Sequence, residues 1–197
     1  MSQEYWWASE SFWRKNAIWI TAGSFLVLIF LTFDTVSQIT AGGKRVPGYS
    51  VINHRISYEF DETRNFQVPV IGVEEPLFGQ KLTEEEAQAL VTRGKLTTQA
   101  KNCMNCHTLL GNGAYYAPDL TKSWLDPSWG TKEIREQEMV DFLMNPQDRL
   151  HNGLGRRMPN LGITEDEARA TVAFLKWMAS IDTNGFPANF VSIDQEN

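Results

Sequence analysis

The chain has 197 residues and a formal net charge of −6, from 18 lysine and arginine residues against 24 aspartate and glutamate residues. This length fits one domain of common size with additional segments. The first 33 residues contain two acidic and two basic side chains, so the whole net charge belongs to the rest of the chain. An acidic surface disfavours nucleic-acid binding, because phosphate backbones select basic surfaces.

An uncharged apolar run from Asn16 to Phe33 predicts one transmembrane anchor over residues 16–34. As an α-helix these residues measure about 27 Å, close to the ~30 Å hydrocarbon core of a bilayer. Arg14 and Lys15 precede the run and Asp34 follows it. The positive-inside rule then predicts a cytoplasmic N-terminus over residues 1–15 and places everything after the anchor on the other side of the membrane.

A cleaved signal peptide is the alternative interpretation of this run. Signal peptides have an apolar region of about 7 to 15 residues that ends at a cleavage site of small residues. The nearest candidate site, Ile39-Thr40-Ala41, has a large residue in the first position. The sequence therefore favours a retained anchor.

Residues 35–82 are predicted to form a periplasmic linker or insertion. Glycine and proline interrupt it between residues 43 and 80, and two stretches alternate in polarity, from Ile52 to Phe60 and from Phe66 to Val70. This pattern indicates a short β-like or extended segment, for which a two-stranded flap and a docking surface for a membrane partner both remain open. His54 lies on the apolar side of the first stretch and is expected to be a packed or hydrogen-bonded histidine, not an iron ligand.

Residues 83–197 have a helical pattern. Thr83 to Glu86 is a capping box that opens a helix running toward Ala100, and a second helix is expected over residues 132–144. Another capping box, Thr164 to Glu167, opens a third helix that runs to Ile181. The fold class is therefore predicted to be mainly α, with one N-terminal transmembrane helix, a short β-like or extended insertion and a helical domain.

The only two cysteines fall in the pentapeptide Cys103-Met104-Asn105-Cys106-His107. This is the attachment sequence of a covalently bound c-type haem. Two thiols at this spacing form thioethers with one porphyrin, and the histidine that follows binds the iron. Because such haems are attached on the outer side of the bacterial inner membrane, the motif and the predicted topology agree on a periplasmic haem domain.

The same spacing has two other possible uses. A zinc site needs further thiolate or imidazole ligands, and the chain offers only His54 and His151. A dithiol redox centre is normally carried by a βαβ pattern, which is missing here, and it gives His107 no role. One covalently bound haem c remains the favoured cofactor. Three helices around one haem predict the arrangement of a class I cytochrome c domain over residues 83–197.

Two residues near the motif are expected to support it. Gly94 stands nine residues before Cys103, where helix crossing in this architecture needs a residue without a side chain so that Phe174 or Trp177 can approach. Pro118 lies in a loop whose carbonyl group is able to accept the proton of the proximal imidazole and fix its orientation. The alternative is that Pro118 only turns the loop.

Met158 is the predicted second axial ligand of the iron. Three other methionines, at positions 139, 144 and 178, fall in amphipathic helices, where methionine usually fills the core. Met158 instead precedes a proline in an irregular loop, far enough past His107 to reach the other face of the porphyrin. His151 is the alternative ligand. Arg156 and Arg157 adjoin Met158 and are expected either to pair with haem propionates or partner carboxylates, or to be solvated.

The segment from Asn102 to Leu120 resembles the haem-binding segment of the small cytochrome c subunit of bacterial respiratory nitric oxide reductase. The segment from Gly155 to Pro159 and the tail around Phe174 to Pro187 resemble the same family. The resemblance implies an electron-transfer subunit that is not an enzyme on its own. It would receive electrons from a periplasmic cytochrome c or cupredoxin.

The resemblance also implies a partner, a large polytopic subunit with haem b and non-haem iron that reduces two NO molecules to N2O and water. Gly113 and Tyr115 match family positions near a calcium ion at the subunit interface. Asn112 departs from the glutamate that family members often carry, and the stretch 43–80 is longer than the usual connection.

Two other functions remain open at this stage. A membrane-tethered haem sensor would bind a gas after Met158 dissociates, and rapid binding of CO or NO to the ferrous protein would favour it. A cytochrome c subunit of an oxygen-reducing terminal oxidase would copurify with a different large subunit.

Overall fold

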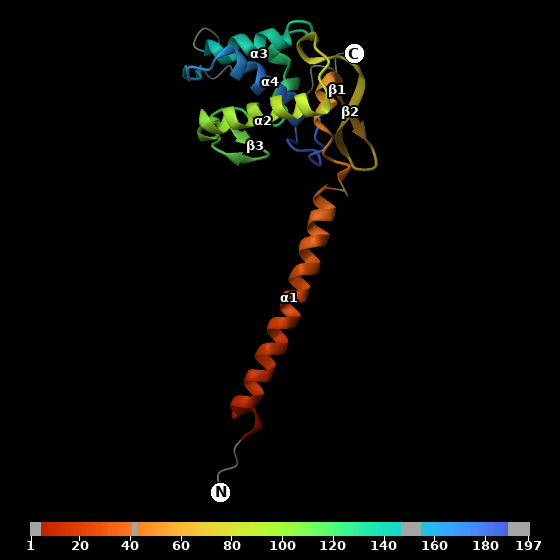
Figure 1. The fold of residues 1–197 in the computed structure, drawn as a ribbon, viewed down its shortest axis with the longest axis vertical. Coiled ribbons are helices and arrows are strands. Elements are labelled where there is room, and N and C mark those ends of the chain that lie inside the picture. The colour runs from red at the N-terminus through yellow and green to blue at the C-terminus, as the bar shows by residue number, and fades with distance from the viewer. Residues whose placement is uncertain (1–4, 41–42, 147–154, 189–197) are drawn as a thin grey trace. The chain divides into compact units, whose positions relative to one another are not determined.

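The computed structural model describes residues 5–40, 43–146 and 155–188. It divides into two compact units, Met1–Arg45 and Val46–Asn197. The first unit is dominated by helix α1, Glu10–Thr40, which extends beyond both ends of the predicted span (Figure 1). This is the one helix among the described residues that is long and apolar enough to cross a bilayer, and none of its apolar window is buried by protein. Its exposed side chains suit a lipid environment.

The second unit begins with a β-hairpin. Strands β1, His54–Asp61, and β2, Phe66–Glu74, pair antiparallel, with Tyr58 opposite Pro69 and Phe60 opposite Gln67. The alternating pattern of the sequence predicted these strands, and Ile56 and Tyr58 are the positions that face the core. His54 is hydrogen-bonded within the hairpin, with its Nδ1 atom 3.3 Å from the carbonyl oxygen of Gly72.

Three helices form the rest of the unit: α2, Glu84–Ala100, α3, Arg135–Met144, and α4, Glu165–Ala179. Both predicted capping boxes are present. The Thr83 hydroxyl accepts the Glu86 N–H and the Glu86 carboxylate accepts the Thr83 N–H, and Thr164 and Glu167 repeat this arrangement at α4. A mainly helical chain with one apolar N-terminal helix and small strands confirms the predicted fold class.

Helices α2 and α4 cross at Gly94, as the sequence predicted. A Cβ atom on Gly94 would lie 2.0 Å from the carbonyl oxygen of Ala170 and 2.8 Å from the Cβ atom of Phe174. The backbone of α4 therefore occupies the space that any other side chain would need. The Phe174 approach is confirmed, whereas the Trp177 ring stacks on Tyr49, 5.2 Å between centroids.

The residues before α2 are packed into the same core as the helices. Val51, Ile52 and Ile56 belong to one buried cluster with residues of α2, α3 and α4. The Tyr58 hydroxyl donates to the carbonyl oxygen of Ala179 at 2.6 Å, and the Lys176 ammonium donates to that of Glu75 at 3.0 Å. Residues 46–82 are thus an integral part of the domain that was predicted to begin at residue 83. The alternation of apolar and polar residues predicted the two strands, but it did not indicate that they pack on the helices.

Candidate haem-binding site

The Cys103–His107 motif follows directly after helix α2. Asn102 has a left-handed backbone conformation (φ 53°), which ends the helix and starts a 3-10 turn over Cys103–Asn105. The His107 N–H donates to the carbonyl oxygen of Cys103 at 2.9 Å. Both cysteines are free and partly buried, and burial raises the pKa of the Cys103 thiol. The turn thus holds two reduced thiols and one imidazole within a single short segment.

The His107 side chain is oriented by Pro118. Nδ1 of the imidazole lies 2.7 Å from the carbonyl oxygen of Pro118. A carbonyl oxygen only accepts hydrogen bonds, so Nδ1 carries the proton and Nε2 keeps its lone pair. Burial lowers the pKa of His107 and favours this neutral form. The residue pair is the one that the sequence named, and the arrangement suits a metal ligand with a fixed ring plane.

A polar network that the sequence analysis missed closes the loop after His107. The Asp119 carboxylate accepts the Thr108 hydroxyl at 2.6 Å and the Thr121 N–H at 2.8 Å. The Thr121 hydroxyl accepts the N–H of Leu110 at 2.7 Å, where the backbone is left-handed (φ 51°). The sequence did contain a weak signal for this network. An aspartate side chain often accepts the backbone N–H of the second residue after it, in an Asx turn, as Asp119 does with Thr121.

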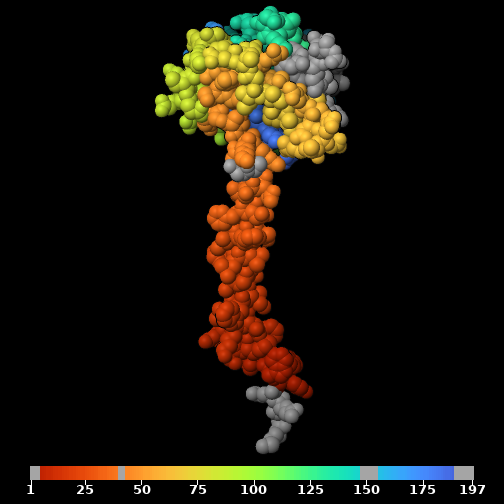
Figure 2. All heavy atoms as spheres, turned by 90° about the vertical axis from the view of Figure 1, so that its right-hand side faces the viewer, coloured from red at the N-terminus to blue at the C-terminus, as the bar shows by residue number. Residues whose placement is uncertain are grey.

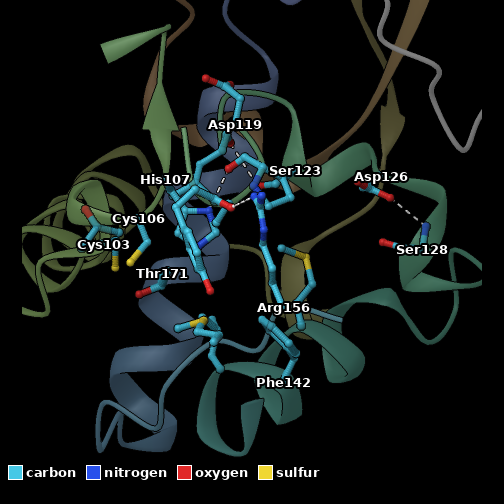
Figure 3. A pocket seen from close by; sticks show the side chains of 18 of the residues that line it. Cys103, Cys106, His107, Asp119, Ser123, Asp126, Ser128, Phe142, Arg156 and Thr171 are labelled. Carbon is cyan, nitrogen blue, oxygen red and sulfur yellow. Dashed lines mark hydrogen bonds between the residues drawn. The ribbon is translucent and has the colours of Figure 1, made fainter. Parts of the chain in front are cut away.

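The motif opens into a cavity of about 1170 Å³, its open mouth included. Figure 3 shows both thiols and the imidazole turned into the space that Phe142 closes from another side. The lining combines the thiols and the imidazole with mostly apolar side chains, including Leu120, Trp129, Met139, Phe142, Leu143 and Met158.

Met158 lines the same cavity as His107. It is partly buried and belongs to an irregular segment, as expected for a ligand carried by a loop. Met139 also lines the cavity, but it is 1% exposed and is held by helix α3 within the core. The alternative ligand His151 lies outside the described residues. Two thiols, a neutral imidazole and a thioether on one apolar cavity are a donor set that fits a covalently bound haem.

Arg156 and Arg157 both line this cavity. The Arg156 guanidinium donates to the carbonyl oxygen of Tyr116 and lies 4.8 Å from the centroid of the Tyr116 ring (Figure 3). This contact bridges the ligand loop and the loop after His107. Pairing of either arginine with haem propionates stays a prediction.

Gly113 and Tyr115 lie beside the motif but outside the cavity lining. Gly113 belongs to the small strand pair β3, Thr108–Leu109, and β4, Asn112–Gly113. A Cβ atom there would lie 2.2 Å from the carbonyl oxygen of His107, so glycine is needed for this close approach. The Tyr115 side chain is 82% exposed. Among the described residues no three histidine, cysteine or acidic side chains are grouped as a metal site, and calcium near Gly113 and Tyr115 stays a prediction.

Comparison with known proteins agrees with this geometry. The cytochrome c family model matches residues 91–179. The C subunit of nitric oxide reductase from Stutzerimonas stutzeri is 35% identical over 117 residues, which are 58% of this chain and 76% of the relative. The C subunit from Paracoccus denitrificans is 34% identical over 54% of this chain and 70% of the relative, and that from Cereibacter sphaeroides is 34% identical over 50% and 67%. The chain therefore belongs to the family of nitric oxide reductase C subunits.

Proposed function

We propose that this chain is the membrane-anchored cytochrome c subunit of a nitric oxide reductase, and that it transfers electrons without itself reducing NO. The observation that carries the proposal is the convergence of Cys103, Cys106, His107 and Met158 on one largely apolar cavity. Family membership supports the assignment to this reductase, because the relatives are named as its C subunit. The long apolar helix α1 supports a membrane anchor.

The residues of the cavity have separate roles in this proposal. Cys103 and Cys106 would tether the porphyrin, and His107 and Met158 would hold its iron. When bound, haem c supplies a one-electron couple. The Pro118 carbonyl oxygen fixes the orientation of the His107 ring, and the apolar walls exclude water. An iron held by both of these side chains would have no free position for a substrate.

The partner and the topology belong to the same proposal. The chain would form a heterodimer with a large polytopic subunit that carries haem b and non-haem iron, where NO becomes N2O. Its electrons would come from a periplasmic cytochrome c or cupredoxin. The anchor would cross the bacterial inner membrane with the N-terminus in the cytoplasm and the haem domain in the periplasm. Arg14 and Lys15 on one side of the apolar run and Asp34 on the other support this orientation.

Purification of the tagged full-length chain in mild detergent tests the partnership. We expect a large membrane subunit with haem b and non-haem iron, and NO consumption when a reduced cytochrome c is supplied. Copurification with a copper-containing oxidase subunit would instead assign the chain to a terminal oxidase. Rapid CO binding by the ferrous protein at neutral pH would assign it to gas sensing.

Mass analysis of the mature polypeptide tests the cofactor separately. We expect one porphyrin that acid acetone does not extract. Replacing both cysteines, in Cys103→Ser/Cys106→Ser, is expected to abolish this covalent addition, because serine forms no thioether. A polypeptide without added porphyrin would refute the haem assignment whatever the partner is.

A further inference from the structure

A second cavity lies between the β-hairpin, the segment after the haem-binding loop and the residues that follow α4. It holds about 510 Å³, open space at its mouth included. Its lining combines aromatic rings with amides and one ammonium group, contributed by Tyr58, Phe60, Asn65, Phe66, Gln67, Lys122, Gly185, Phe186, Pro187 and Ala188. Figure 2 shows blue atoms of the C-terminal part beside the yellow-orange atoms of the hairpin region.

Lys122 is the charged group of this cavity, and only 3% of it is exposed. Its Nζ atom donates to the carbonyl oxygen of Ile181 at 2.9 Å and lies 4.4 Å from the centroid of the Tyr58 ring. An ammonium group has three N–H donors, and within the described structure this one makes a single hydrogen bond. Two donors of a buried cation are therefore available on the side of the cavity.

The charge of Lys122 is only partly compensated. The carboxylate of Asp182 attracts Lys122, but it already accepts both Nη atoms of Arg64, at 2.6 and 3.1 Å. Asp61, which is half-buried, also attracts Arg64, and its carboxylate accepts the Thr63 hydroxyl at 2.6 Å. Burial outweighs the attraction of Asp182 and lowers the pKa of Lys122 to about 7. Among the described residues Lys122 forms no ion pair, and the half-buried carboxylate of Asp182 is engaged by Arg64.

Gln67 adds a second unsatisfied polar group to the same cavity. Its Oε1 atom is buried without a hydrogen-bond partner among the described residues. Gln67 pairs with Phe60 across the hairpin, so it shares a strand face with Tyr58, whose ring Lys122 contacts. A buried polar atom without a partner is destabilising, and rotation of the amide by 180° presents either a donor or an acceptor to a ligand.

We infer that this cavity binds a small monovalent anion, held by the Lys122 ammonium and the Gln67 amide between aromatic walls. The ammonium, which forms no ion pair among the described residues, selects an anion, and its single charge selects a monovalent one. The volume and the flanking rings suit a planar oxyanion or a small carboxylate. Water alone would satisfy the hydrogen bonds but would leave the charge uncompensated.

Calorimetric titration of the purified holoprotein in detergent tests the inference, with nitrate and acetate as probes and gluconate as the bulky background anion. We expect saturable binding of one equivalent near pH 6, and weaker binding as the pH rises above about 7, since Lys122 then loses its proton. Lys122→Met is expected to weaken binding by about tenfold or more, the range of a hydrogen bond to a charged group.

Lys176→Met is the matched control. Lys176 is also a buried lysine that donates to one backbone carbonyl, that of Glu75, but it does not line the cavity. We expect this variant to bind nitrate like the unmodified protein. The inference would be overturned if Lys122→Met bound nitrate as tightly as the unmodified protein does. It would also be overturned if the unmodified protein showed no saturable nitrate or acetate binding.

Gln67→Glu is a second variant for the same titration, to be used if Lys122→Met does not fold. The substitution preserves shape and places a carboxylate beside the ammonium, so it supplies the missing anion from the chain itself. We expect it to abolish nitrate and acetate binding and to leave the haem spectrum unchanged. Undiminished binding to this variant would place the anion elsewhere.

Discussion

The crossing of α2 and α4 and the loop from Asn102 to Thr121 are held together in different ways. At the crossing, backbone and side-chain atoms pack so closely that Gly94 admits no Cβ atom. In the loop, polar groups hold left-handed backbone in place, through the carboxylate of Asp119 and the hydroxyl of Thr121. Packing therefore defines the scaffold, whereas hydrogen bonds define the positions of the groups that bind the cofactor.

The largest effect is expected from Gly94→Leu, which breaks the crossing. Its Cβ atom would overlap the carbonyl group of Ala170, which belongs to helix backbone and has no room to move aside. Overpacking against side chains costs about 1–3 kcal/mol, and a backbone clash costs more. We expect no accumulation of holoprotein, measured as haem absorbance per mole of purified chain.

Gly23→Leu is the matched control for that variant. Gly23 is also a helical glycine, in α1, and nothing lies within 4 Å of its added Cβ atom. We expect a normal yield of holoprotein. A normal yield from Gly94→Leu as well would contradict the close crossing.

Met158→Ala breaks the site without touching the crossing. We expect the methionine-to-iron charge-transfer band to disappear while the covalent haem and the helix content remain, because the thioether is removed from an irregular segment and not from a helix. Near-infrared or long-wavelength visible absorbance of the oxidised protein measures this. Met139→Leu, a substitution of similar volume in the other methionine of the cavity, is expected to retain the band. Loss of the band in Met139→Leu alone would reassign the ligand.

Asp119→Ala tests whether the loop depends on its hydrogen bonds. The substitution leaves the Thr108 hydroxyl and the Thr121 N–H without their acceptor. We expect the free energy of unfolding to fall by about 1–3 kcal/mol, the cost of unsatisfied buried polar groups. Denaturant unfolding followed at the haem absorbance measures it. Asp126→Ala, which removes one hydrogen bond to Ser128 in an exposed turn, is expected to have a smaller effect.

The smallest effect is expected from the helix caps. Thr83→Ala and Thr164→Ala each remove an N-cap from one helix of the crossing, which should cost about 1 kcal/mol. Urea unfolding followed by circular dichroism measures both, and the haem spectrum is expected to stay unchanged. Equal sensitivity of the haem spectrum to the caps and to Asp119→Ala would show that the two regions are not separable.

Local sequence patterns predicted most of the scaffold, because caps, helix periodicity and strand alternation act over a few residues. The Thr83 and Thr164 caps and the contact of His107 with Pro118 lie within short segments, and the Gly94 crossing followed from the spacing of this glycine to Cys103. Long-range contacts were not predictable in this way. The Lys176 ammonium donates to the backbone carbonyl oxygen of Glu75, 101 residues away. Every residue has such a carbonyl group, so the sequence does not indicate which one a distant side chain will contact.

The candidate site shows the same limit. The motif identified the thiols and the imidazole, but the aromatic walls at Trp129 and Phe142 depend on where α3 packs. Two methionines line the cavity, and only the contrast between loop and helix distinguished Met158 from Met139.

The integration of residues 46–82 has a practical consequence for anyone who wishes to produce the water-soluble part alone. A fragment that starts at the capping box of α2 would uncover the apolar surface that Val51, Ile52 and Ile56 now shield, and it would lose the two backbone N–H groups, of Tyr49 and Ser50, that Glu84 accepts. Such a truncation should aggregate. Expression boundaries are better set near Val46, where the second compact unit begins.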